Sequence, residues 1–77
     1  MRVSLLALPV GEEGIVSHIM GGPGFIRRLE CMGVRIGKKV RKVASQPFRG
    51  PVIIEVDRTK IALGRGIASR IIVEVLS

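Results

Sequence analysis

Cysteine and aromatic residues are scarce in this chain. The single cysteine, Cys31, excludes an internal disulfide framework and fits a reducing compartment, although pairing between two chains stays open. Trp and Tyr are absent, and the aromatic residues are Phe25 and Phe48. The core must therefore be built from Ile, Val, Leu and Met, and because Val and Ile favour pleated strands, the composition predicts a β-rich domain.

Long apolar runs are also missing. The stretch from Val3 to Val10 is short and is interrupted by Pro9, which argues against a signal peptide. No window approaches the roughly 20 apolar residues that a membrane-spanning helix needs. The sequence predicts one cytoplasmic domain over residues 1–77.

Acidic residues are outnumbered by basic ones. The chain has 13 Lys and Arg against 6 Asp and Glu, a formal net charge of +7. Such a surface attracts nucleic acid, an anionic membrane face or an acidic protein, and charge alone does not choose among them.

Short apolar stretches bounded by Gly, Pro and polar residues predict five or six strands. Five of them fall within 15–20, 37–44, 52–56, 61–63 and 71–75. Residues 4–8 are either a further strand or a short helical start. Ile15 and Ile19 are expected to share one strand face, with His18 on the other. Val40 and Val43 have opposite parity, which predicts a bend or bulge between them. Short, evenly spaced strands predict a partly closed antiparallel barrel.

One short helix is expected at about 24–32, after a glycine-rich break containing Pro23. Its helical projection places Phe25, Leu29 and Met32 on the face that packs on the sheet, while Arg27 and Cys31 point away.

The end of this helix is marked by two residues. Gly33 fits the left-handed position just past the helix, and Val34 would contact Leu29 in a Schellman cap. A second, single helical turn is expected near 66–70.

Several motifs recur in order along the chain, and together the chain resembles the ferrous iron transport protein A (FeoA) family. The matching residues are Arg28-Leu29, Met32-Gly33-Val34, Gly37 and Val40, then Pro47-Phe48 and Gly50-Pro51-Val52, then Ile61-Ala62-Leu63, Ala68, and Ile71 with Val73. The chain departs from the family pattern at Ile36, Gly64 and Ile67, where Pro, Arg and Glu are frequent.

This resemblance implies an SH3-like β-barrel that acts as an accessory of the FeoB ferrous iron transporter, whose cytoplasmic part carries a GTPase domain. It implies no catalysis and no cofactor, and a location in the cytoplasm or at the inner membrane face through the partner. Metal-dependent repressors of the diphtheria-toxin-repressor type share the barrel, but no DNA-binding helices precede it here.

The sequence shows no set of residues typical of an enzyme or a metal site. No nucleophile, base and orienting group can be assembled from one His, one Cys and scattered acids. Gly21 to Gly24 lacks the Gly-Lys-Ser/Thr end of a phosphate loop. His18 and Cys31 are too few to make a structural metal site, so none is predicted.

A partner-binding surface is the remaining expectation. Its candidate residues are Arg27, Arg28, Cys31, Lys38, Lys39, Arg41, Lys42 and Phe48. Phe48, on a Pro/Gly loop, is either an exposed anchor for a partner or a lid folded over the barrel end.

The alternative function is a basic nucleic-acid-binding barrel, suggested by the run Arg35, Lys38, Lys39, Arg41 and Lys42. Single-strand binding generally uses several aromatic platforms, which this chain lacks, so nucleic acid is the less favoured partner. Homo-oligomers stay open.

Overall fold

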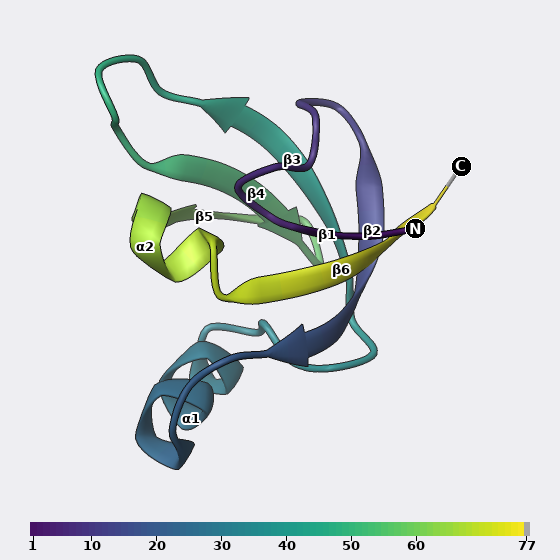
Figure 1. The fold of residues 1–77 in the computed structure, drawn as a ribbon, viewed down its shortest axis with the longest axis vertical. Helices are drawn as coiled ribbons and strands as arrows, with labels where there is room; N and C mark the ends of the chain where they lie inside the picture. Colours follow the sequence, from purple (N-terminus) through teal and green to yellow (C-terminus); the bar gives the residue numbers. More distant parts are fainter. Residues whose placement is uncertain (77) are drawn as a thin grey trace.

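The computed structural model describes residues 1–76, and Ser77, the last residue of the predicted 1–77 domain, lies outside the described residues. Within them the chain forms six strands and two helices (Figure 1), in the order β1 (Arg2–Ser4), β2 (Glu13–Ile19), α1 (Pro23–Cys31), β3 (Lys39–Ser45), β4 (Val52–Val56), β5 (Thr59–Leu63), α2 (Arg65–Ala68) and β6 (Ile71–Leu76). The predicted mainly β fold with one short helix and one helical turn is confirmed.

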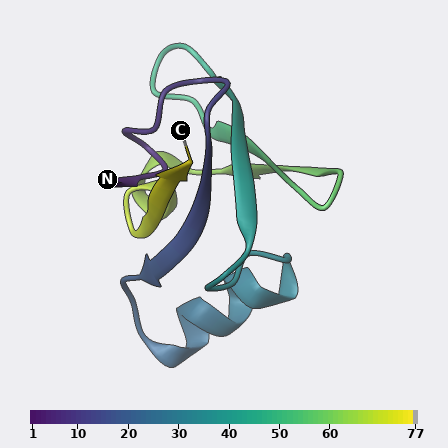
Figure 2. The same cartoon turned by 90° about the vertical axis from the view of Figure 1, so that its right-hand side faces the viewer.

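The six strands form one antiparallel sheet in the order β1-β6-β2-β3-β4-β5. The sheet is strongly curved: Figure 2 shows β2 and β3 upright while the β4–β5 hairpin crosses behind them and projects to one side. This is the predicted partly closed barrel, with β1 and β5 as its edges. Helix α1 lies outside the sheet at one end.

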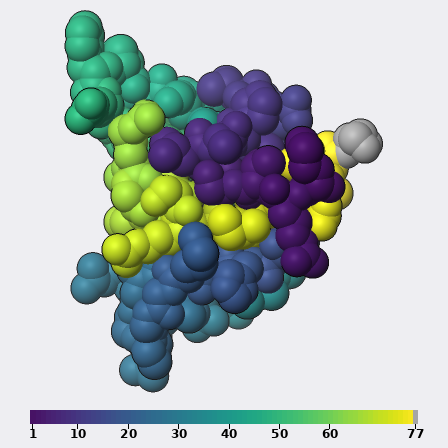
Figure 3. Space-filling model, viewed as in Figure 1, coloured from purple at the N-terminus to yellow at the C-terminus, as the bar shows by residue number. Residues whose placement is uncertain are grey.

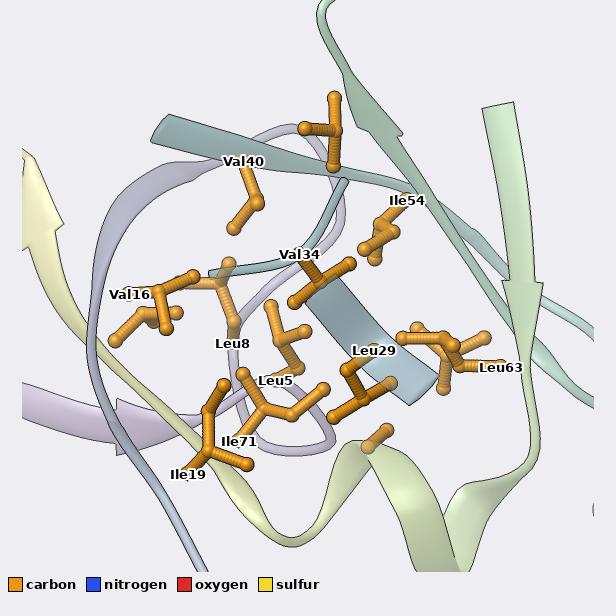
Figure 4. Close-up of a cluster of buried hydrophobic side chains, with 14 residues drawn as sticks. Leu5, Leu8, Val16, Ile19, Leu29, Val34, Val40, Ile54, Leu63 and Ile71 are labelled. Carbon is orange, nitrogen blue, oxygen red and sulfur yellow. The ribbon is translucent and has the colours of Figure 1, made fainter. Parts of the chain in front are cut away.

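The core is aliphatic. Its buried members are Leu5, Leu8, Val16, Ile19, Leu29, Val34, Val40, Val52, Ile54, Val56, Leu63, Ala68, Ile71 and Val73 (Figure 4). Ile, Val and Leu fill it as predicted, but methionine does not: Met20 and Met32 are exposed. Phe25 is only partly buried, so the core has no aromatic centre.

Helix α1 buries less than its projection predicted. Leu29 is its one buried residue, whereas Met32 is 38% exposed, so placing Met32 in the core was wrong. The helix ends at Cys31 and the chain turns at Gly33, with φ of 95°, so Val34 fills the next core position instead.

The predicted Schellman cap is confirmed at the end of α1. The Val34 N–H donates to the Leu29 carbonyl at 2.9 Å, and the Gly33 N–H donates to the Glu30 carbonyl at 3.0 Å. The positive φ explains why glycine stands at this position.

Strand β2 carries a bulge that reverses one predicted face. Its register with β6 shifts between Val16 and His18, and the Ser17 hydroxyl donates to the Ile72 carbonyl at 3.2 Å. The extra residue lets Val16 and Ile19, three apart, both face the core. The expectation that Ile15 shares the Ile19 face was therefore wrong, while His18 is exposed on the other side.

Two other local questions are resolved. The predicted bulge in β3 is present, with a register shift against β4 between Lys42 and Ala44. Residues 4–8 match neither alternative in full: Ser4 ends strand β1, and the chain then makes one hydrogen-bonded turn in which the Leu8 N–H donates to the Ser4 carbonyl at 2.9 Å and both Leu5 and Leu8 are buried.

Candidate partner-docking surface

Phe48 stands at the tip of the loop between β3 and β4. Its side chain is 99% exposed, so of the two alternatives left by the sequence the lid is wrong. The loop reaches beyond the rest of the barrel, at the upper left of Figures 1 and 3. A large apolar side chain that stays fully in water contributes no burial free energy to folding. Aromatic side chains in such positions are frequent anchors at interfaces.

The loop that carries Phe48 is a hydrogen-bonded turn. The Gly50 N–H donates to the Pro47 carbonyl and the Gln46 N–H to the Pro51 carbonyl, each at 3.1 Å. Phe48 and Arg49 have φ of 57° and 60°, a left-handed conformation that side chains other than glycine adopt at a cost in free energy. The turn therefore displays an aromatic and a cationic side chain on strained backbone.

The basic strand is largely neutralised by acids. Three of its predicted docking cations are paired: Lys38 Nζ with Asp57 Oδ2 at 2.6 Å, Lys39 Nζ with Glu13 Oε2 at 3.8 Å, and Arg41 Nη2 with Glu55 Oε1 at 3.0 Å. A shallow depression of about 290 Å³ beside these pairs is lined by Glu13, Lys39, Val40, Arg41, Glu55, Asp57 and Arg58. The expected cationic strip is therefore a surface of mixed charge, which also removes much of the motive for the nucleic-acid alternative.

A row of alternating charges crosses the outer face of four neighbouring strands. The registers place Glu13 beside Arg41, Arg41 beside Glu55, and Glu55 beside Lys60. We call Glu13, Arg41, Glu55 and Lys60 the charge ladder. Opposite charges on directly facing positions stabilise a sheet by a few tenths of a kcal/mol to about 1 kcal/mol each.

Lys42 does not belong to the exposed surface. Its side chain is 4% exposed, and its Nζ donates to the Leu6 carbonyl at 2.9 Å. Placing it with the solvent-facing cations was wrong, because Lys42 has the same strand parity as the buried Val40. That shared parity was the available sequence signal.

Burial, and secondarily the positive charge of Arg65, lower the pKa of Lys42 from 10.5. Between the lowered pKa and 10.5 the unfolded chain binds more protons at this residue, so its contribution to the free energy of unfolding rises with pH across that window. We expect the stability difference between the native chain and Lys42→Met to shift in favour of the native chain from neutral pH to 10.5, measured by chemical denaturation. A difference that stays constant with pH would contradict this.

The remaining predicted residues lie on α1. Arg27, Arg28 and Cys31 are exposed, and neither arginine forms an ion pair within residues 1–76. Both views place α1 at the end of the molecule opposite the Phe48 loop. The predicted site residues are thus not one patch: they divide among the Phe48 loop, the face around the charge ladder, and α1.

The described residues contain neither a metal-binding cluster nor a membrane-spanning helix. In residues 1–76 no three His, Cys, Asp or Glu side chains gather closely enough to hold a metal ion. Neither α1 nor α2 is long and apolar enough to cross a bilayer.

The residue that sequence reasoning missed is Arg49, which lies beside Phe48 on the turn. Its place in the sequence directly after Phe48 was the available signal.

Comparisons with known proteins agree with this architecture. A family model described as the FeoA domain matches residues 3–75. A protein of Methanocaldococcus jannaschii, provisionally named Fe(2+) transport protein A, is 47% identical over 64 residues, which cover 83% of this chain and 76% of that protein.

Two solved structures have the same fold. The crystal structure of an iron uptake regulatory protein (FeoA) superposes with a TM-score of 0.90 at 36% identity and covers 99% of both chains. A manganese-dependent transcriptional repressor superposes with a TM-score of 0.87 at 26% identity, over 97% of this chain and 42% of the repressor. The SH3-like fold implied by the sequence resemblance is thereby confirmed.

Proposed function

Because the chain belongs to the FeoA family, we propose that it is a non-enzymatic accessory protein of ferrous iron uptake that docks on the cytoplasmic part of a FeoB-type transporter. In this proposal residues 1–77 act as a single domain in the cytoplasm, held at the inner membrane face by the partner. The proposal is supported by the names of two similar proteins, one called an Fe(2+) transport protein and the other an iron uptake regulatory protein.

The observation that carries the proposal is the exposure of Phe48. The hydrogen-bonded turn holds this side chain clear of the barrel, and Arg49 beside it adds a positive charge. Buried aromatic and arginine side chains dominate the energetics of many protein interfaces. We therefore assign the main contact to Phe48 and Arg49, with Arg27 and Arg28 on α1 as a separate, secondary surface.

Replacing Phe48 with serine is the direct test. Because the side chain is 99% exposed, we expect the melting temperature of Phe48→Ser to stay at the native value. Binding to the transporter's isolated cytoplasmic domain, measured by titration calorimetry, is expected to weaken by roughly tenfold or more, the effect of removing an interface anchor.

Ile36→Ser is the matched control, since Ile36 is another exposed apolar side chain, 62% accessible, outside the Phe48 loop. It should bind as the native chain does. The docking proposal fails if the native chain does not associate with the cytoplasmic domain and iron uptake is unchanged in cells that lack the protein. Equal binding by native chain and Phe48→Ser would move the contact elsewhere.

A further inference from the structure

Strand β5 is an open edge of the sheet. It pairs with β4 from Thr59, opposite Val56, to Leu63, opposite Val52. On its other side, no residue from 59 to 63 makes a backbone hydrogen bond to any part of the chain that the structure describes. Such an edge is a template for a further strand.

The backbone groups that face this open side can be assigned from the hairpin. The two-residue turn of Asp57 and Arg58 is closed by the pair Val56 and Thr59. Hydrogen-bonded and non-hydrogen-bonded pairs alternate along an antiparallel ladder, so Lys60 and Ala62 direct their N–H and C=O groups away from β4. Both residues are exposed.

The side chains of β5 define what an added strand should carry. On the outer face the charge ladder ends at Lys60, which has Glu55 beside it on β4 and no neighbour on the open side. On the inner face Ile61 is only half-buried against the core. An added strand would extend the ladder with a carboxylate opposite Lys60 and complete the burial of Ile61 with an apolar side chain.

We propose that the β5 edge binds an extended segment of a partner protein in which acidic and apolar residues alternate. Main-chain hydrogen bonds to Lys60 and Ala62 would hold the segment, and Lys60 and Ile61 would select its side chains. A second copy of this chain fits poorly, because it would bring another Lys60 to the same edge of a protein with a net charge of +7. Phe48 is not part of the β5 edge, so this inference goes beyond the proposed function and does not depend on it.

The probe is an acetylated, fluorescently labelled octapeptide that alternates Val and Glu, titrated with the native chain and followed by anisotropy. The control is a block peptide with the same composition, its Glu residues first and its Val residues after. Because the two peptides carry the same charge, their general electrostatic attraction to a basic protein is equal. Strand addition, by contrast, requires Val and Glu to alternate between the two faces of the added strand. We expect the alternating peptide to bind at least tenfold more tightly than the block peptide.

Two variants connect binding to β5. Ala62→Pro removes an N–H that faces away from β4, a place where edge strands tolerate proline, so the chain should stay folded and lose at least tenfold in affinity. Lys60→Glu should weaken binding of the alternating Val/Glu peptide and strengthen binding of a Val/Lys peptide. Circular dichroism confirms the fold of each variant.

Amide exchange measured by NMR gives an independent readout. On peptide binding, the amides of Lys60 and Ala62 should become protected, while Phe48→Ser should bind the peptide as the native chain does. The inference is overturned if the two peptides bind equally, if folded Ala62→Pro keeps the native affinity, or if protection of β5 appears without peptide through self-association.

Discussion

Replacing Leu29 with alanine is expected to lower the free energy of unfolding by about 2–5 kcal/mol, the range found for leucine truncation in packed cores. Leu29 is 2% exposed and is the one residue of α1 that is fully buried. Figure 4 shows it pointing into the middle of the cluster, between Leu5 and Leu63. Its loss would open a cavity where α1 joins the barrel, and urea denaturation followed by circular dichroism measures the effect.

Met32→Ala is the matched control for this prediction, because Met32 is apolar, sits at the C-cap of the same helix and is 38% exposed. We expect its effect to stay within about 0.5 kcal/mol, as for most surface substitutions. Leu29→Met, which conserves volume, should cost less than about 1.5 kcal/mol. Similar losses for Leu29→Ala and Met32→Ala would mean that α1 is anchored by its whole apolar face.

Replacing Lys42 with alanine is expected to have the second-largest effect. The substitution removes the donor to the Leu6 carbonyl, and an unsatisfied part-buried acceptor costs about 1–3 kcal/mol. It also removes the buried carbon stem of the lysine, which adds to the loss. Thermal and urea unfolding of the variant measure the total.

Arg41→Ala is the neighbouring control. Arg41 is paired with Glu55 on the surface at 3.0 Å, and exposed pairs of this kind contribute about 0–1 kcal/mol. Although the two cations are adjacent in sequence, the Lys42 variant should be clearly less stable than the Arg41 variant. If Arg41→Ala proves the more damaging, the charge ladder rather than the buried amine stabilises this part of the sheet.

Much of the fold follows from local signals in the sequence. Gly33 and Val34 predicted the end of α1, because a glycine followed by an apolar residue is the pattern of a Schellman cap, in which the glycine adopts a left-handed conformation. The mismatch between Val40 and Val43 predicted the bulge in β3 because parity is conserved along a regular strand.

The β2 bulge could not be predicted in the same way. Ile15 and Ile19 already agree in parity, so nothing in the strand signals an extra residue at Ser17. The bulge is defined by the register of β2 with β6, a strand more than 50 residues away in sequence. Such pairing depends on tertiary contacts, and periodicity within one strand does not contain it.

The site was harder to predict than the fold for the same reason. The sequence shows cations in a run, but only the cross-strand registers show that Glu13 and Glu55 lie beside Arg41. Loop composition drew attention to Phe48, yet whether it was exposed depended on how the hairpin leaves the barrel. The sequence identified candidate residues for the site, whereas the structure was required to show which of them lie next to one another.

The sheet order has a consequence for how the chain folds during synthesis. Strand β6 lies between β1 and β2 and buries Ile71 and Val73 in the core, and Figure 3 shows the N-terminal segment lying against it. Strand β1, whose neighbour in the sheet is β6, therefore has no strand to pair with during synthesis until β6 emerges from the ribosome, while β2, β3, β4 and β5 can pair in sequence order as soon as they are made. Folding of β1 into the sheet is thus a late, long-range event, and this is the stage at which a chaperone would find the apolar residues of the N-terminal segment in the open.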